Sequence, residues 1–288
     1  MSAIIMTDSC CDLPISFINE HQIPTISLSF FLDGKEYVDD FGITLDYHSF
    51  YDMIRSGKMS TTSQINTQQF IDFFRIYLDQ QIDILFVAFS SALSGTCNSA
   101  LIASNTLKEE YPDRTITVID SLCASMGQGL LVHSAVMMKE EGYSLPDIVE
   151  WLENNKLKLN HWFTVEDLNH LKKGGRISAA SAFVGTILDI KPILNVNNEG
   201  KLSPVEKVKG RKKSLRILME KLEARIINAE QQTIMISHGD SLDDAKHLKE
   251  FILSKVRVQN IIINNVGPVI GSHSGPGTIA LFFYGEQR

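Results

Sequence analysis

The chain has 288 residues with the composition of a globular protein, since 44% of them are hydrophobic and 21% are charged. This length indicates two domains of ordinary size. A formal net charge of −7 argues against a general binder of nucleic acids or anionic membranes. The four cysteines have no metal-binding spacing, which indicates reduced thiols. We therefore expect a cytoplasmic protein without bound metal or stable membrane insertion.

The first half of the chain alternates predicted strands with predicted helices. Strands are expected over residues 3–6, 25–32, 82–89 and 115–120. Helices are expected over residues 48–57, 67–80, 100–110, 128–141 and 145–156. The pair Asp33-Gly34 predicts a hairpin, and the polar segment 59–64 carries no predicted helix or strand. This alternation predicts right-handed crossovers and a largely parallel sheet.

The second half mixes hairpins with helices. Strands are expected over residues 161–165, 191–196, 201–208, 233–238, 261–266 and 278–283. Helices are expected over residues 166–176, 178–190, 212–226 and 241–256. We predict an N-terminal three-layer α/β/α domain over residues 1–158, with a mainly parallel sheet. Residues 159–288 are expected to form a C-terminal α/β domain with a mixed sheet.

The segment VGPVIGSHSGPGTIALFFY, residues 266–284, is interpreted as a glycine-rich loop between two apolar strands. His273 lies at its centre, between Ser272 and Ser274. The glycines permit positive φ or a close approach of the backbone to a neighbour. A loop with hydroxyls and an imidazole suits a small polar group, and residues far upstream must complete such a site.

Hydroxyl side chains collect in three further segments. Residues 7–9 and 90–96 each follow a predicted strand, and residues 61–64 precede a predicted helix. Helix capping explains any single serine or threonine at such a turn. The hydroxyls of Ser90, Ser91 and Ser94 cannot all cap one helix. In open α/β sheets ligands bind beyond the carboxyl ends of the strands, so the three segments together predict a polar crevice.

Motifs for nucleophilic catalysis do not fit well. The segment Gly271–Gly275 has His273 where a serine hydrolase carries its nucleophile. Residues 275–280 match G-x-G-x-x-A, but they precede a strand and no dinucleotide-binding unit can follow. An enzyme that acts on a small acyl or phosphoryl substrate through Ser94 or His273 stays an alternative.

Two charged features allow further interpretations. His238 and Asp240 could bind a metal ion, although turn and capping roles are far more common for such residues. The basic run Lys207–Lys213 lies at a predicted helix start, where positive charge is unfavourable. This conflict favours an anionic ligand or partner at the run over a merely solvated surface.

Several motifs occur in an order that resembles the DegV family: TDSCCDLP, TTSQ, SSALSGT, DLNHLKKGGRIS, KPIL, GKLSPVEKVKGRKK and VIGSHSGPGTIALFF. The resemblance covers the chain from Thr7 to Phe283. The family comprises bacterial fatty-acid-binding proteins, some of which are the binding subunit of fatty acid kinase. Two departures are visible: Cys10-Cys11 replace small or mixed residues, and Ile65 replaces a proline that often follows T-S-Q.

The resemblance implies a two-domain α/β protein that encloses one long-chain fatty acid between its domains. It implies no cofactor and no catalytic residue, because the partner kinase supplies ATP and forms the acyl phosphate used in phospholipid metabolism. Arg176 and Arg211 are expected near the head group or on the kinase-facing surface. The implied carboxylate-binding residues are Thr62, Ser63, Ser94, Ser272 and His273.

The expected ligand has an apolar tail and a charged head, which need different surroundings. A buried carboxylate without hydrogen bonds is heavily penalised, and we expect hydroxyls and one imidazole to bind it without a permanently charged cation. The apolar helix over residues 179–190 is a candidate wall for the tail, although ordinary core packing explains it equally well. The wall residues would be Phe183, Val184, Ile187 and Leu188.

Overall fold

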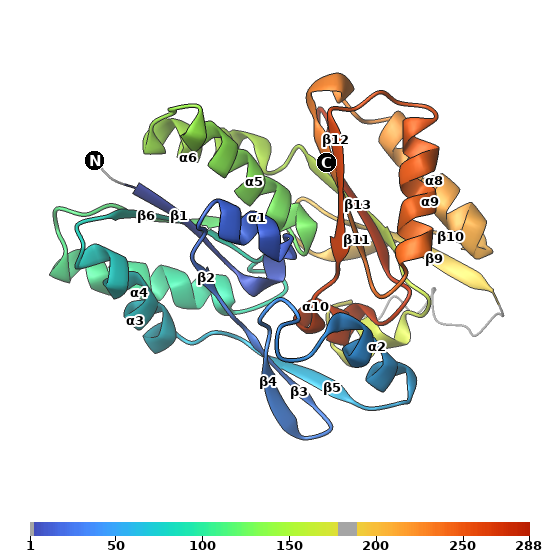
Figure 1. The fold of residues 1–288 in the computed structure, drawn as a ribbon, viewed down its shortest axis with the longest axis horizontal. Coiled ribbons are helices and arrows are strands. Elements are labelled where there is room, and N and C mark those ends of the chain that lie inside the picture. Colours follow the sequence, from blue (N-terminus) through green and yellow to red (C-terminus); the bar gives the residue numbers. More distant parts are fainter. Residues whose placement is uncertain (1–2, 178–188) are drawn as a thin grey trace.

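The computed structural model describes residues 3–177 and 189–288. The fold is mixed α/β, with a parallel sheet, a mixed sheet and a small third sheet (Figure 1). The predicted fold class is therefore confirmed. All described strands of the mixed sheet begin at Leu159 or later. This observation supports the predicted boundary between residues 158 and 159, which stays a prediction.

The N-terminal sheet is parallel, with the order β2-β1-β6-β7. Its strands are β1 (Ala3–Asp8), β2 (Thr25–Ile26), β6 (Asp83–Ala88) and β7 (Ile116–Asp120). One face carries α3 (Thr67–Leu78) and α4 (Thr96–Glu110), and the other carries α5 (Met126–Glu140) and α6 (Leu145–Asn155). Every residue of β6 is buried, because Phe86 packs into one face and Leu85 into the other. An uninterrupted apolar strand is typical of a sheet covered on both faces.

A small antiparallel sheet with the order β4-β3-β5 projects from the N-terminal half (Figure 1). It consists of β3 (Ser29–Leu32), β4 (Lys35–Val38) and β5 (Ser60–Ser63), and α2 (Tyr47–Arg55) connects β4 to β5. The predicted hairpin is present, with positive φ at Asp33 (56°) and Gly34 (81°). Strand β5 was not predicted, because its four residues are all serine or threonine and show no apolar alternation.

The C-terminal sheet is mixed, with the order β10-β9-β8-β13-β11-β12. Only β11 and β12 pair in parallel. The strands are β8 (Leu159–Thr164), β9 (Ile190–Val196), β10 (Leu202–Lys209), β11 (Thr233–His238), β12 (Asn260–Asn265) and β13 (Ile279–Tyr284). Its helices are α7 (Asn169–Lys173), α8 (Arg211–Glu223), α9 (Leu242–Leu253) and α10 (Pro268–Ser274). The short helix η2 (Ala229–Gln231) also belongs to this half, whereas α1 (Ile15–Glu20) and η1 (Ser9–Cys11) follow β1 in the N-terminal half.

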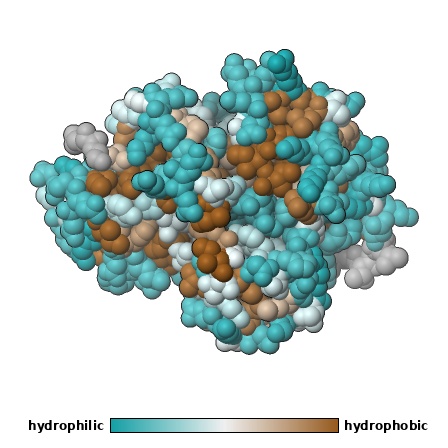
Figure 2. Space-filling model, viewed as in Figure 1, coloured by the Kyte–Doolittle hydropathy of each residue, from teal (hydrophilic) through white to brown (hydrophobic). Residues whose placement is uncertain are grey.

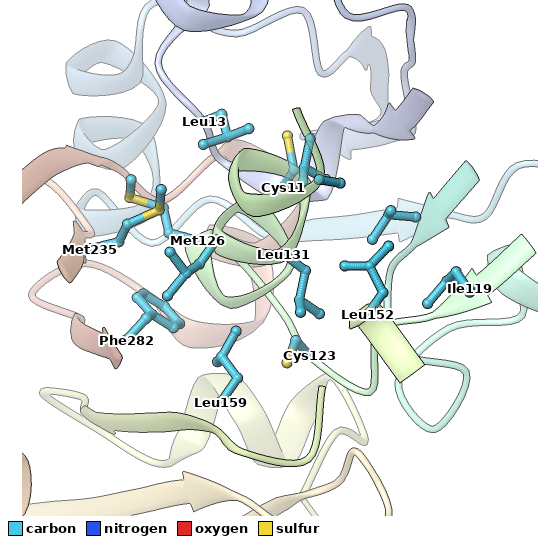
Figure 3. Close-up of a cluster of buried hydrophobic side chains, with 14 of the residues drawn as sticks. Cys11, Leu13, Ile119, Cys123, Met126, Leu131, Leu152, Leu159, Met235 and Phe282 are labelled. Carbon is cyan, nitrogen blue, oxygen red and sulfur yellow. The ribbon is translucent and has the colours of Figure 1, made fainter. Parts of the chain in front are cut away.

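Helix α5 packs between the two large sheets. It contacts β1 and β6 of the parallel sheet and β8, β11 and β13 of the mixed sheet. Figure 3 shows its side chains Met126 and Leu131 among Ile119 of the parallel sheet and Phe282 of the mixed sheet. All these side chains belong to one buried cluster. The helix therefore joins the hydrophobic cores of both halves.

A buried chain of hydrogen bonds crosses between the halves near the start of α5. The carboxyl group of Asp12 accepts hydrogen bonds from Ser125 Oγ and from the backbone N–H of Gly267, the latter at 2.9 Å. Ser125 Oγ also lies 2.9 Å from Ser237 Oγ on β11. Asn264 Nδ2 donates to the carbonyl of Asp12 at 2.8 Å. Asp12 thus connects the first loop of the chain to α5, β11 and the start of α10.

The prediction of a glycine-rich loop over residues 266–284 is partly wrong, because residues 268–274 form the helix α10. Glycines have a low helix propensity, but Pro268 occupies the favoured first position of this helix. Five of its seven residues are buried, so tertiary packing decides the conformation. The predicted wall residues Phe183, Val184, Ile187 and Leu188 lie outside the described residues.

Hydrophilic residues cover most of the face shown in Figure 2, and the hydrophobic residues on it form separate patches. The exposed large hydrophobic side chains come from many different elements, including Val38, Met59, Leu101 and Leu253. Within residues 3–177 and 189–288, no helix combines the length and the apolar character that crossing a bilayer requires.

Gly271 in α10 is predicted to tolerate no side chain. A Cβ atom at this position would lie 2.5 Å from Tyr51 Oη and 3.0 Å from Phe50 Cε1, and both aromatic side chains are fully buried. We expect Gly271→Ala to lower the free energy of unfolding by ~1–3 kcal/mol, the usual range for overpacking. Urea denaturation followed by circular dichroism measures this change.

A matched variant tests the steric cause. Tyr51→Phe removes the hydroxyl that would clash, together with its 2.9 Å hydrogen bond to the carbonyl of Val266. The double variant, Gly271→Ala with Tyr51→Phe, should lose less free energy of unfolding than the sum of the losses in the two single variants. Simple additivity of the two effects would contradict the steric explanation.

Candidate functional site

A cavity of about 370 Å³ is lined by residues from both halves of the chain. This volume falls in the range of small-molecule sites, ~300–1,000 Å³. Apolar atoms form most of its wall. The apolar lining residues include Leu28, Phe89, Leu93, Phe163, Leu171, Leu202, Val269, Ile270 and Ala280.

Strand β5 and helix α10 bring two predicted site residues into contact. Thr62 Oγ1 lies 2.8 Å from His273 Nε2, although the two residues are 211 positions apart. Thr62 pairs with Phe30 on β3, and the small sheet thereby holds the threonine against α10. Both side chains line the cavity, as does Ser63.

Ser94 contributes a hydroxyl from the turn between β6 and α4. It lines the same cavity, and its Oγ lies 2.9 Å from Thr96 Oγ1 and accepts the backbone N–H of Thr96 at 3.3 Å. Ser91 in the same turn is exposed, whereas Ser90 is buried and donates to the carbonyl of Gly200 at 2.9 Å. Only Ser94 of these three serines faces the cavity.

Arg176 adds a positive charge to the cavity wall. Its half-buried guanidinium donates from Nε to the carbonyl of Leu93 at 3.3 Å and from Nη1 to the carbonyl of Gly174. The first contact ties the segment after α7 to the turn that carries Ser94. Arg176 lines the same cavity as Thr62 and His273, where the sequence predicts it near the head group, and its contact with the ligand stays a prediction.

The imidazole of His273 is held neutral. Burial, and secondly the nearby charge of Arg176, lower its pKa to about 4. Its Nδ1 is buried without a hydrogen-bond partner among the described residues. A Cβ atom on Gly174 would lie 2.1 Å from this nitrogen, so the ring packs directly on the glycine backbone. A glycine in the KGGR segment is thus required by the position of His273.

Two predicted site residues lie elsewhere. Ser272 donates to the carbonyl of Pro268 at 2.7 Å and contacts Ser60 Oγ at 2.6 Å, and it does not line the cavity. On α10 it points to a different side from His273. Arg211 starts α8 and pairs with Asp244 at 2.9 Å, also outside the cavity. Ser272 instead lines an adjoining cavity together with Thr62 and His273, and the kinase-facing role of Arg211 stays a prediction.

The first hydroxyl segment, residues 7–9, also lies outside the cavity. Thr7 Oγ1 donates to the carbonyl of Val87 at 2.9 Å, and Ser9 Oγ accepts the backbone N–H of Leu28 at 3.1 Å. Asp8 caps the short helix η1. These residues satisfy backbone groups, as the capping explanation predicts.

Three polar residues of the cavity lining were not predicted from the sequence. His161 on β8, Ser125 before α5 and Ser237 on β11 line it, and all three are buried. A histidine within the apolar strand HWFTV was the available signal, because a buried polar group requires an explanation. Ser125 gave no comparable signal, since its contacts come from distant segments.

The hydrolase alternative receives no support from the contacts among the described residues. His273 contacts Thr62 and Ser94 contacts Thr96, so within residues 3–177 and 189–288 no histidine is hydrogen-bonded to the hydroxyl of Ser94. No carboxylate of residues 3–177 or 189–288 is hydrogen-bonded to His273. The base and the orienting acid of a catalytic triad are therefore not assembled in this part of the chain.

A group of possible metal ligands lies on the surface. His48, Asp52 and Asp240 bring their ligand atoms within 4.8 Å of one another. Arg55 already forms ion pairs with both carboxylates, which favours a surface ion-pair network. His238 is not part of this group, because it is buried and its Nδ1 accepts a backbone hydrogen bond at 3.3 Å. The group of possible metal ligands thus contains Asp240 but not His238.

These features define a two-domain α/β protein with a ligand-sized cavity that both halves line. A family model described as "Uncharacterised protein, DegV family" matches residues 2–286, and the chain belongs to this family. A DegV domain-containing protein of Clostridium perfringens is 48% identical over 99% of this chain and 98% of its own length.

Two solved structures share the fold over nearly the whole chain. A DegV family protein from Thermus thermophilus, described by its fatty acid binding, is 32% identical with a TM-score of 0.89 and covers 99% of this chain and 100% of its own. DegV from Bacillus subtilis, described as a fatty acid binding protein, is 28% identical with a TM-score of 0.82 and the same coverage.

Removing the charge of Arg176 should raise the pKa of His273. We expect Arg176→Met to shift the pKa upward from about 4, but to leave it below the usual 6.5 because burial remains the larger cause. The imidazole stays neutral at pH 7 in both proteins. NMR titration of the His273 ring signals measures the shift. Lys173→Met is the matched control, and an unchanged or lower pKa in Arg176→Met would contradict the explanation.

Proposed function

We propose that this protein binds a long-chain fatty acid in the cavity and presents its carboxylate to a fatty acid kinase for phosphorylation to an acyl phosphate. The observation that carries the proposal is the group formed by Thr62, Ser94, Arg176 and His273 in a mainly apolar cavity. The protein itself then acts without catalysis and needs no cofactor.

The polar group suits a carboxylate in both charge and hydrogen bonding. Thr62 and Ser94 offer hydroxyl donors, and the guanidinium of Arg176 offers a positive charge. Hydrogen bonds between ionised partners are about twice as strong as neutral ones, which offsets the desolvation of the carboxylate. His273 adds a neutral N–H that avoids a second buried charge. Ser63 lines the cavity beside Thr62 and remains a candidate ligand.

The apolar wall and the relatives support a fatty acid as the ligand. An acyl chain gains ~0.8 kcal/mol for each methylene removed from water, so an apolar cavity favours long chains. The proteins of Thermus thermophilus and Bacillus subtilis that share this fold are both described as binding fatty acids. Each of the two structures covers 99% of this chain.

A second cavity of about 400 Å³ supports the approach of a phosphoryl group. It shares Thr62, Arg176 and His273 with the first cavity. Lys58, His170 and Lys173 line it as well, and no acidic residue belongs to its described lining. Lysine and arginine side chains stabilise a transferring phosphoryl group. We infer that the kinase approaches the carboxylate through this basic cavity, and that Arg211 contributes to the kinase-facing surface.

Fatty acid binding should depend on both hydroxyls. We expect Thr62→Val and Ser94→Ala to weaken binding on the order of tenfold each, because each removes a hydrogen bond to a charged group. Isothermal titration of delipidated protein with a long-chain acid measures this. Ser91→Ala, in the same turn as Ser94 but exposed, is the matched control and should bind like the unaltered protein.

Lipid extraction tests the ligand class itself. The protein purified from cells should release long-chain fatty acids that mass spectrometry identifies. If no such acid co-purifies and none binds to the delipidated protein, the proposed function is wrong.

The basic cavity should serve transfer rather than binding. We expect Lys58→Met combined with Lys173→Met to retain fatty acid affinity but to reduce acyl phosphate formation with the kinase and ATP on the order of tenfold. Lys172→Met is the control, because Lys172 is exposed and does not line this cavity. Unchanged acyl phosphate formation in the double variant would argue against this route.

A further inference from the structure

A second histidine lines the same cavity, and among the described residues it forms no hydrogen bond with the proposed carboxylate site. His161 lies on β8 and is only 4% exposed. Alternation along the strand directs His161 and Phe163 to the same face, and both line the cavity. On the neighbouring β13, Phe282 is paired with His161 and Ala280 is paired with Phe163. The small side chain of Ala280 leaves room above the sheet beside the imidazole.

The imidazole of His161 lacks hydrogen bonds within the described part of the chain. Its Nδ1 is buried without a partner, and no hydrogen bond joins Nε2 to another described residue. Its ring neighbours are Phe282, with centroids 4.5 Å apart, and Phe163, at 5.5 Å. Buried polar side chains are satisfied in the large majority of cases, so an unsatisfied imidazole facing a ligand cavity indicates a partner in that cavity.

The chemistry of this partner follows from the state of the ring. Burial, with a further contribution from the charge of Arg288, lowers the pKa of His161 to about 3. The imidazole is therefore neutral at physiological pH, with one N–H donor and one nitrogen acceptor. A second carboxylate would find no further lysine or arginine in the described cavity lining, because Arg176 already belongs to the carboxylate site. A hydroxyl group can donate to the ring or accept from it, whichever tautomer is present.

We propose that the preferred ligand is a long-chain fatty acid with a hydroxyl group on its acyl chain, which hydrogen-bonds to His161. This inference rests on the proposed function, in which Thr62, Ser94, Arg176 and His273 bind the carboxylate. The two polar sites then define the distance along the chain between carboxylate and hydroxyl. A saturated chain would leave the imidazole against methylene groups, with neither nitrogen satisfied.

A set of hydroxy acids tests the proposal. Delipidated protein is titrated with the saturated acid and with acids of the same length that carry the hydroxyl at successive positions. We expect one narrow range of positions to bind on the order of tenfold more tightly than the saturated acid, the effect of one well-placed hydrogen bond. Equal or weaker binding at every position would overturn the proposal and indicate that water satisfies His161.

The variant His161→Phe tests whether this residue is the cause. Phenylalanine has a similar shape without polar atoms, so the variant should lose the preference for the hydroxy acid while binding the saturated acid at least as well. Ser94→Ala serves as the comparison, because it should weaken both acids equally. A hydroxyl preference that persists in His161→Phe would overturn the assignment to this residue.

NMR of the unaltered protein gives a readout that does not depend on the folding of a variant. The ring nitrogen signals of His161 should shift when the preferred hydroxy acid binds, and shift differently with the saturated acid. Identical signals with both acids would overturn the proposal. Failure of every acid to bind would instead refute the proposed function, so the two failures are distinguishable.

Discussion

The hydrogen bonds of the Asp12 carboxyl group determine how the two halves of this protein meet. One oxygen accepts from Ser125 at the start of α5, and the other accepts from Gly267 at the start of α10. The group is almost fully buried, and burial raises its pKa well above the usual value. Because unsatisfied buried polar groups are costly, the two donors and the carboxyl group fix one another in place. The cavity forms between the two helix starts that Asp12 connects.

The position of His273 follows from this junction. Helix α10 has only seven residues, so its orientation depends on contacts at its ends. Asp12 holds Gly267 at one end, and Tyr51 donates to the preceding carbonyl of Val266. The histidine then meets Thr62 from the small sheet across 2.8 Å. Short elements with many external contacts thus assemble a site that no single element could position.

Sequence patterns predicted most of the large elements, because hydrophobic periodicity records which faces are buried. The run 84–88 is apolar because helices cover the parallel sheet on both faces. The patterns failed where long-range contacts decide the structure. Strand β5 has only serines and threonines, and its pairing with β3 makes it a strand. Helix α10 contains Gly271, and glycine has a low helix propensity. Packing of the helix against Phe50 and Tyr51 stabilises it nevertheless.

The same limit applies to the candidate site. The resemblance to the DegV motifs implied Thr62, Ser94 and His273 as site residues, and they line one cavity. Ser272 was included because it neighbours His273 in sequence, but adjacent residues of a helix point in different directions. His161 was overlooked because motif reasoning searches loops, whereas this residue is on a strand in the middle of the mixed sheet. The residues of the candidate site are therefore those that are close in space, whether or not they are close in sequence.

The charges of the proposed site balance when a carboxylate is bound. Arg176 is positive and His273 is neutral, so one anionic head group gives a site without net charge. A protonated His273 would add a second cation beside the guanidinium, and their mutual repulsion disfavours it in a buried cavity. In the proposed phosphoryl transfer, negative charge would be added on the side of Lys58 and Lys173, which line the second cavity. The acyl chain and the new charge then lie in separate environments, each suited to one end of the molecule.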